Sequence, residues 1–311
     1  MKIVFLDTKT MGNVSNLYLL EQFGEVVYYP LTPAELTAQR TADADIVITC
    51  KVVIDQKVID ASPSLKLICA AATGINHIDS KYAISKGIEV CNVSDYSTNS
   101  VAQTTFAHIL SLLNHVRYYD QFVKDGSYSK YDMFSHMDME IGEIYGKTFG
   151  IIGLGAIGRK VALIAKAFGA NVCYYSTSGN NNNPDYKKVS LDELLIISDI
   201  ITIHAPLNNN TINLIDIDKL KLMKPSAILI NVARGGIVVE KDLAFAIDNK
   251  IIAGAATDVF SVEPVKADNP LLHVFNKDKI SFSPHCAWTS IEARTKLIEG
   301  IAQNIRRFLY R

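Results

Sequence analysis

The chain has 311 residues, which is long for a single hydrophobic core and suggests two domains. With 49% hydrophobic residues, 20% charged residues and a formal net charge of -1, the composition is typical of a globular protein and offers no electrostatic attraction to nucleic acid or to an anionic membrane. No apolar run is long enough to span a bilayer, residues 1–6 read as a strand rather than a signal peptide, and the five cysteines form no C-x-x-C pair. We therefore expect a cytoplasmic protein with reduced thiols and with neither a nucleic acid nor a membrane as partner.

Residues 1–98 contain short apolar runs of strand length, separated by segments with a helical pattern. We expect strands over 2–6, 26–29, 46–49, 65–70 and 88–92, a helix over 13–23 and a short helix that opens at Pro33. Strands that alternate with helices favour a parallel sheet covered on both faces. No glycine fingerprint occurs here, so this part of the chain need not bind a nucleotide itself.

A long, mostly apolar helix is predicted over 100–122, and it begins in a cluster of Ser, Thr and Asn residues suited to capping. Because this helix lies between two α/β series, we interpret it as a domain connector. The polar, aromatic-bearing segment 125–144 reads as a loop that covers a surface or a cleft. At the end of the chain, a helix over 290–310 carries an apolar stripe that suits packing on the first domain.

The second α/β series opens with a G-x-G-x-x-G turn. A strand over 148–152, the glycine turn at 153–158, a helix and a strand over 172–175 form a βαβ unit, which is the context of a dinucleotide-binding fingerprint rather than of a merely glycine-rich turn. Gly153 permits the tight turn, Gly155 lets the backbone approach a pyrophosphate, and Gly158 lets the helix pack close to the strand. The anion would lie on free N–H groups at the helix N-terminus, from Ala156 and Ile157.

The position that selects the coenzyme departs from the NAD pattern. An acidic residue about 20 positions after the glycines normally accepts the ribose 2′-hydroxyl, and this chain has Ser176 there. The missing carboxylate removes the main repulsion against a 2′-phosphate, so NADP is an alternative coenzyme. No arginine follows to hold such a phosphate, however, and the nearest cations, Lys187 and Lys188, lie beyond the asparagines at 180–183. We predict NAD.

Polar residues follow the later strands, which are predicted over 200–204, 227–231, 253–258 and 280–283. Ligands of open α/β sheets bind at the carboxyl ends of strands, so these residues are candidates for one site. Three of them suit acid–base or anion chemistry: Arg234 in NVARGG, Glu263 in DVFSVEP and His285 in SPHCAW. Taken singly, each also fits a structural role, as a surface cation, a solvated turn residue or a cap, but their order after a nucleotide fold favours the functional interpretation.

The chain resembles the D-isomer-specific 2-hydroxyacid dehydrogenase family, and within it the glycerate dehydrogenase/hydroxypyruvate reductase group. The resemblance covers nearly the whole length, and its motifs in family order are far more specific than the glycines alone. They are ATGINHID (72–79), CNVSDYSTNSVAQTTFAHIL (91–110), IIGLGAIG (151–158), HAPLNNNT (204–211), NVARGGIV (231–238), ATDVFSVEP (256–264) and SPHCAW (283–288).

The resemblance implies an α/β fold of two doubly wound parallel-sheet domains. A Rossmann coenzyme domain at 99–287 would be inserted into a discontinuous, flavodoxin-like substrate domain made of 1–98 plus 288–311. It also implies an enzyme that interconverts a 2-oxo acid and a D-2-hydroxy acid by hydride transfer with NAD(P), the pair being hydroxypyruvate/D-glycerate or glyoxylate/glycolate. A homodimer is implied as well, formed through the long helix that begins near Ser100, and no metal is required.

The resemblance also assigns roles to single residues. His285 is the general acid, because imidazole can give and take a proton near neutral pH, and Glu263 is the partner that favours its protonated form. Arg234 clamps the substrate, because the guanidinium is a planar fork that grips a carboxylate and polarises a carbonyl. Backbone N–H groups at Thr73, Gly74 and Ile75 form a second carboxylate cradle, whereas Lys51 faces the same cleft or is a plain surface lysine. The expected coenzyme contacts are Gly153, Gly155, Ala156, Ile157, Gly158, Ser176, His204, Pro206, Thr211, Val232, Ala233, Arg234, Asp258 and His285.

Two other functions share these features. A formate or phosphite dehydrogenase has the same fold and coenzyme, but formate dehydrogenases pair the histidine with glutamine where this chain has Glu263. An NAD-sensing binding protein, like the transcriptional corepressors of the family, carries partner-binding extensions that this sequence does not show. The sequence leaves the side chain of the substrate open, because a pocket separates such small substituents by only about 1–3 kcal/mol.

Overall fold

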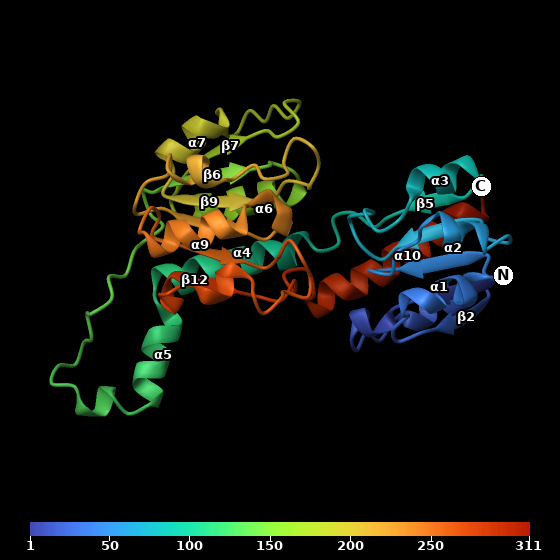
Figure 1. The fold of residues 1–311 in the computed structure, drawn as a ribbon, viewed down its shortest axis with the longest axis horizontal. Helices are drawn as coiled ribbons and strands as arrows, with labels where there is room; N and C mark the ends of the chain where they lie inside the picture. The colour runs from blue at the N-terminus through green and yellow to red at the C-terminus, as the bar shows by residue number, and fades with distance from the viewer. The chain divides into compact units, whose positions relative to one another are not determined.

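The computed structural model describes residues 1–311, and the chain divides into two compact units. The first unit joins both ends of the chain, Met1–Ser97 and Trp288–Arg311, and the second unit is Thr98–Ala287 (Figure 1). Each unit is built on one parallel sheet. The α/β class with two parallel sheets is therefore confirmed. No helix has both the length and the apolar character needed to cross a bilayer.

The first unit contains a five-stranded sheet in the order β2-β1-β3-β4-β5, which is the flavodoxin-like order. Its strands are β1 (Lys2–Phe5), β2 (Glu25–Tyr28), β3 (Ile46–Thr49), β4 (Leu67–Ala70) and β5 (Glu89–Cys91). Its helices are α1 (Ala34–Thr41), α2 (Gln56–Asp60), α3 (Ser80–Ser85) and α10 (Ile291–Leu309), with 3-10 turns η1 (Thr8–Met11) and η2 (Leu17–Phe23). The α-helix predicted over 13–23 is wrong, because Gly12 at φ 56° ends the first turn and only the seven residues of η2 remain before Gly24.

The last helix belongs to the core of the first unit, as the sequence suggested. Ser290 caps α10 by accepting a hydrogen bond from the N–H of Ala293 at 3.2 Å. Leu297, Ile298 and Ile301 are fully buried in one cluster with side chains of β1, β3 and β4. Burying each such side chain contributes about 1.5–3 kcal/mol, so the unit depends on the end of the chain for its stability.

The second unit contains a seven-stranded sheet in the order β12-β11-β10-β9-β6-β7-β8. Its strands are β6 (Thr148–Ile152), β7 (Asn171–Tyr175), β8 (Lys187–Lys188), β9 (Ile200–Ile203), β10 (Ile228–Asn231), β11 (Gly254–Thr257) and β12 (Ile280–Phe282). Its α-helices are α4 (Thr98–Leu113), α5 (Val116–Lys124), α6 (Ala156–Ala167), α7 (Leu191–Ile197), α8 (Ile217–Leu220) and α9 (Glu240–Asp248), and its 3-10 turns are η3 (Tyr128–Lys130), η4 (Gly235–Ile237), η5 (Pro270–His273) and η6 (Lys277–Lys279). The strand order reverses between β6 and β9, and the glycine turn follows β6 at this switch point, where open α/β sheets bind their ligands.

The single long helix predicted over 100–122 is wrong. The chain forms α4 and then α5, and between them His115 adopts the left-handed conformation at φ 49°, which breaks the helical hydrogen-bond ladder. The two halves also differ in burial, because α4 buries seven side chains and α5 buries none. His115 is held in the break by a 3.1 Å hydrogen bond from its ring to the carbonyl of Glu140.

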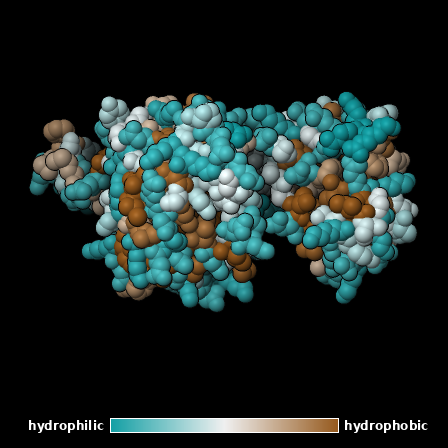
Figure 2. All heavy atoms as spheres, turned by 90° about the horizontal axis from the view of Figure 1, so that it is seen from above, coloured by the Kyte–Doolittle hydropathy of each residue, from teal (hydrophilic) through white to brown (hydrophobic).

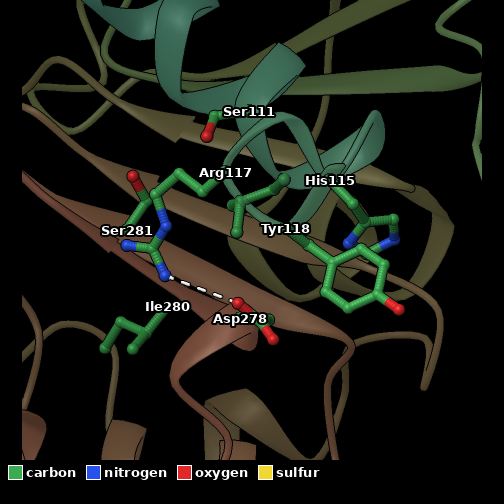
Figure 3. A pocket seen from close by; sticks show the side chains of 8 residues that line it. Ser111, His115, Arg117, Tyr118, Asp278, Ile280 and Ser281 are labelled. Carbon is green, nitrogen blue, oxygen red and sulfur yellow. Dashed lines mark ion pairs between the residues drawn. The ribbon is translucent and has the colours of Figure 1, made fainter. Parts of the chain in front are cut away.

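The segment 125–144 is a loop, as predicted, apart from the short turn η3. It does not cover the sheet of its own unit but continues α5 into an arm, defined here as residues 116–141, which extends away from that sheet (Figure 1). The arm has its own small aromatic core, in which the rings of Phe122 and His136 stack at 4.0 Å. Its base is anchored by Arg117, which donates to the carbonyl of Lys277 at 2.8 Å and lies 3.7 Å from the carboxylate of Asp278 (Figure 3). The cavity beside this anchor is only about 10 Å³, which is room for a single water rather than for a substrate.

Candidate active site

The fingerprint turn leaves room where a pyrophosphate would lie. A Cβ built on Gly155 meets nothing within 4 Å, whereas one on Gly158 would lie 2.2 Å from the carbonyl oxygen of Gly153. Gly153 itself has φ 93°, a conformation that favours glycine, and a Cβ there would lie 2.9 Å from the backbone nitrogen of Ala205. The tight turn at Gly153 and the close packing at Gly158 agree with the sequence analysis, and the open space at Gly155 is compatible with the predicted approach of a pyrophosphate.

The N-terminus of α6 has backbone donors to spare. No side chain caps this helix, and its first backbone hydrogen bond runs from Arg159 to Gly155, so the N–H groups of Ala156 and Ile157 have no helical partner. No acidic residue occupies the first turn to repel an anion. Open space, unpaired donors and the positive end of the helix dipole together fit the pyrophosphate of a dinucleotide.

The loop after β9 carries a histidine whose ring nitrogens have no partner. Both ring nitrogens of His204 are buried and accept or donate no hydrogen bond, and burial lowers the pKa of His204 to about 3. The imidazole is therefore neutral at physiological pH. Further along this loop, Thr211 donates its hydroxyl to the carbonyl of the exposed Pro206 at 2.6 Å, which ties the loop to itself. The structure thus gives Thr211 a role in shaping the loop.

Ser176 lies at the end of β7 and is already engaged. Its hydroxyl accepts a hydrogen bond from the N–H of Asn181 at 3.2 Å, and Asn181 reaches back to the carbonyl of Leu154 in the glycine turn at 2.6 Å. Lys188 of β8 reaches the same asparagine loop, donating to the carbonyl of Gly179 at 2.8 Å. One cation therefore contacts the loop that follows Ser176, although no arginine accompanies it.

His285 and Glu263 form a direct pair. Nδ1 of His285 lies 2.6 Å from Oε2 of Glu263, and the two side chains are 21% and 31% exposed. Because a carboxylate only accepts, Nδ1 carries the hydrogen and Nε2 is the nitrogen that can serve a substrate. The other oxygen of Glu263 accepts from the N–H of Phe260 at 3.0 Å, which orients the carboxylate. The sequence separation of 22 residues gave no hint of this distance.

Asp258 holds the backbone that presents the histidine. Its carboxylate is 1% exposed and accepts hydrogen bonds from the N–H groups of Cys286 at 2.9 Å and Ala287 at 3.1 Å. The N–H of His285 donates to the carbonyl of Asp258 at 2.7 Å, and His285 adopts φ 54°. The structure therefore shows Asp258 positioning the loop that carries His285. Any contact between its carboxylate and the coenzyme remains a prediction.

Arg234 follows β10 and points from a tightly packed turn. Its Nη1 donates to the carbonyl of Ala233 at 2.7 Å, and its own carbonyl accepts from the side chain of Asn231 at 2.9 Å. The next residue, Gly235, packs against the segment that carries Glu263, because a Cβ there would lie 1.9 Å from the carbonyl carbon of Phe260. The turn with Arg234 and the turn with Glu263 are thus locked together, while Val232 and Ala233 are buried beside them.

The predicted substrate contacts of the first unit lie at the carboxyl ends of its strands. The exposed Lys51 follows β3, and its N–H donates to the carboxylate of Asp7 at 2.7 Å. Asp7 and Lys51 line a cavity of about 490 Å³ at the point where the strand order reverses between β1 and β3. The exposed Thr73 follows β4, and its hydroxyl donates to the carbonyl of Val93 at 3.3 Å, with Gly74 and Ile75 partly exposed next to it.

Comparison with known proteins now identifies the family. The model of the D-isomer specific 2-hydroxyacid dehydrogenase NAD binding domain matches residues 106–287. The chain belongs to the D-isomer-specific 2-hydroxyacid dehydrogenase family. The chain is 36% identical over 316 residues to the hydroxypyruvate reductase of Blautia hydrogenotrophica. The alignment covers 99% of this chain and 97% of that protein.

Solved structures of similar proteins share this fold over nearly the whole chain. The D-lactate dehydrogenase of Aquifex aeolicus, complexed with NAD and lactic acid, is 27% identical with a TM-score of 0.86 and covers 99% of this chain and 95% of its own. The NADPH-dependent glyoxylate/hydroxypyruvate reductase of Sinorhizobium meliloti, complexed with NADP and malonate, is 25% identical with a TM-score of 0.84. The match covers 99% of this chain and 93% of the reductase chain. This family member is therefore an NAD(P)-dependent oxidoreductase that interconverts 2-oxo acids and D-2-hydroxy acids.

Two supporting residues escaped the sequence analysis. The buried Asp7 positions the backbone of Cys50 and Lys51, and Glu240 accepts from the N–H of Ser261 at 2.7 Å, which steadies the turn before Glu263. An acidic residue directly after a buried strand is a signal that could have found Asp7. Glu240 opens a helix far from the turn that it supports, and no local pattern marks such a contact.

Proposed function

We propose that this dehydrogenase reduces hydroxypyruvate to D-glycerate and glyoxylate to glycolate. The observation that carries the proposal is the 2.6 Å pair of His285 and Glu263 in the unit that carries the dinucleotide turn. The glutamate separates this site from that of formate dehydrogenases, in which the sequence comparison above places glutamine. The relative whose printed name is hydroxypyruvate reductase supports the same substrate class.

The proposed chemistry uses three side chains. When bound, a reduced nicotinamide supplies the hydride that adds to the carbonyl carbon of the 2-oxo acid. His285 gives the proton on Nε2 to the carbonyl oxygen, and Glu263 stabilises the imidazolium and keeps the ring in orientation. Arg234 grips the substrate carboxylate and polarises the carbonyl with N–H groups that its contact with Ala233 leaves available.

We assign the second unit to the coenzyme and the first unit to the substrate. In the second unit, the turn from Gly153 to Gly158 would hold the pyrophosphate, and the neutral His204 and the chain around Val232 would line the nicotinamide side. In the first unit, the N–H groups of Thr73, Gly74 and Ile75 and the ammonium of Lys51 are the proposed carboxylate contacts. Matching of the NAD-binding family model to residues 106–287 supports this division.

We propose NAD as the preferred coenzyme, in the reducing environment of the cytoplasm. All five cysteines are free thiols, which suits that compartment. No arginine lies at the asparagine loop, and the ammonium of Lys188 is already bonded to Gly179 and Asn182. Michaelis constants for NADH and NADPH would test this preference, and a clearly lower constant for NADPH would overturn it. If NADPH has the lower Michaelis constant, Lys188→Ala should weaken NADPH binding more than NADH binding.

We also propose a homodimer formed through the arm. The arm exposes large apolar side chains that a monomer would leave in water: Val116, Val123, Met133, Phe134, Met137 and Ile141, each at least 52% exposed. Brown, apolar side chains appear at the end of the arm, at the left of Figure 2. The occupant that we infer is a second copy, because an isologous contact buries the same patch twice.

Two experiments test these proposals. A panel of 2-oxo acids with NADH should give the highest kcat/KM for hydroxypyruvate or glyoxylate, and a preference for pyruvate or for formate oxidation would refute the assignment. Sedimentation equilibrium should show a dimer that Phe134→Asp weakens by about thirtyfold or more, the scale of an interface hot spot. Phe275→Asp is the matched control, since Phe275 is 94% exposed and lies outside the arm, against 92% for Phe134. A monomeric wild-type protein, or equal effects of the two variants, would refute the arm as the interface.

A further inference from the structure

Two cysteines of the first unit lie face to face across neighbouring strands. Cys69 of β4 and Cys91 of β5 are register partners in the parallel ladder, and their sulfurs are 3.4 Å apart. Neighbouring strands lie about 4.7–4.9 Å apart, which is within the Cα separation of about 4.4–6.8 Å that a disulfide accepts. A small rotation of both side chains would therefore bring the sulfurs to the bonded distance of about 2.05 Å.

The two thiols differ in access to solvent. Cys91 lines an open surface cavity of about 400 Å³ together with Asn304 and Arg307 of α10, whereas Cys69 is fully buried behind it. Cys91 is the member of the pair nearer to solvent, because 9% of that residue is exposed against 0% of Cys69. The pair is thus arranged as an outer thiol with a second thiol directly behind it.

The contact between the two thiols favours the outer thiolate. The hydrogen bond between Cys69 and Cys91 lowers the pKa of Cys91, and the guanidinium groups of Arg307 and Arg311 act in the same direction. Burial and the carboxylate of Glu89 oppose this shift. The same hydrogen bond and complete burial raise the pKa of Cys69. Burial raises the pKa of each of the other three thiols, which are Cys50, Cys173 and Cys286.

We propose that Cys91 is a peroxide-reactive thiol and that Cys69 resolves it to a disulfide. The thiolate of Cys91 attacks one oxygen of hydrogen peroxide, the O–O bond breaks, and hydroxide leaves as the sulfenic acid forms. The sulfur of Cys69 then attacks the sulfur of Cys91, the S–O bond breaks, and the proton of Cys69 leaves with the departing oxygen as water. Two thiols lose two electrons in total, and the peroxide accepts them.

The disulfide would act on the loop that follows β4. The N–H of Val93 donates to the carbonyl of Ala72 at 3.2 Å, and the side chain of Asn92 donates to the carbonyl of Thr73 at 2.6 Å. Any shift of β4 against β5 that accompanies bond formation is therefore transmitted to Thr73 and its neighbours by these hydrogen bonds. This consequence rests on the proposed role of Thr73, Gly74 and Ile75 as substrate contacts, whereas the oxidation itself does not.

Mass spectrometry tests the modification without any activity measurement. After treatment with hydrogen peroxide, the wild-type protein should lose two hydrogen atoms and yield a linked peptide pair containing Cys69 and Cys91. Cys69→Ala should instead retain a sulfenic acid on Cys91 that a 1,3-dione traps, and Cys173→Ala should behave as wild type. A wild-type protein in which Cys91 stays reduced while another cysteine is oxidised would overturn the proposal, and this result needs no variant to fold.

Kinetics test the consequence. The KM of the oxidised wild-type protein for its 2-oxo acid should rise by about fivefold, the scale of one lost hydrogen bond, with unchanged coenzyme affinity and recovery in dithiothreitol. Cys91→Ser should keep its KM after peroxide. A linked pair with an unchanged KM would overturn the connection to Thr73. A protein inactive on every 2-oxo acid would overturn the proposed function and leave the mass test of the thiol pair intact.

Discussion

Gly235 offers the sharpest test of the way in which the active site is held together. In Gly235→Ala, the new Cβ would lie 1.9 Å from the carbonyl carbon and 2.2 Å from the oxygen of Phe260, and 2.3 Å from the nitrogen of Ser261. All three atoms are backbone, so no side chain can turn away. The contact distance that real Cβ atoms keep is at least 3.0 Å, and the two segments must therefore separate by an appreciable part of an ångström or more.

The separation should be costly because the two segments carry Arg234 and Glu263. Overpacking of this kind destabilises a protein by about 1–3 kcal/mol, and a displacement of about 1 Å at a reacting group can cost about a hundredfold in rate. We therefore expect Gly235→Ala to lower kcat/KM for the 2-oxo acid by one to two orders of magnitude and to lower the Tm. The glycine turn that follows β6 should keep its geometry, because it lies elsewhere in the sheet.

The neighbouring glycine supplies the control. A Cβ on Gly236 would lie 3.4 Å and 3.5 Å from the two terminal carbons of the Leu207 side chain, which is ordinary contact with a group that can adjust. Gly236→Ala should therefore keep nearly wild-type kinetics and Tm. Equal kcat/KM and Tm values for the two variants would refute the argument that contact between these two turns positions the catalytic residues.

The remaining predictions concern single groups. His285→Gln should lower kcat by about a hundredfold or more, the scale of general acid catalysis, and near-normal turnover would remove His285 from the mechanism. Arg234→Lys should raise KM and lower kcat/KM by about tenfold or more, because an ammonium cannot replace the guanidinium fork; unchanged kinetics would contradict the clamp. Glu263→Gln should lower kcat for reduction by about tenfold or more, because the imidazolium loses the carboxylate that lies 2.6 Å away and orients its ring, and an unchanged kcat would count against the pairing. His204 makes stability fall as the pH drops from 6.5 towards 3, because its folded-state pKa of about 3 lies below the ordinary value of 6.5 and the unfolded chain binds the proton first. Denaturant titrations of His204→Asn should therefore show a shallower loss in this window than the wild type, by up to about 1.4 kcal/mol per pH unit, and parallel curves would show that His204 gains a proton while folded.

Much of the fold was readable from the sequence, because short-range patterns encode it. The strands predicted over 46–49 and 148–152 agree with β3 and β6 residue for residue, since each is a short run rich in apolar residues. The tasks of Gly153 and Gly158 were also predictable, because a left-handed turn and a close helix–strand approach admit few residues other than glycine. The break at His115 was not predictable, because the hydrophobic stripe continues through it and one left-handed residue leaves no periodic signal.

By itself, the sequence determined the alternation of strands and helices, the place of the dinucleotide turn and the identity of the residues that can donate a proton or grip a carboxylate. The family resemblance paired Glu263 with His285, and only the tertiary structure decided the distances at which these groups meet. The distance between His285 and Glu263, the contact of Gly235 with Phe260 and the register of Cys69 against Cys91 all join segments that are remote along the chain. Such contacts depend on how strands pair and turns pack, and these are properties of the whole sheet that local sequence patterns do not encode.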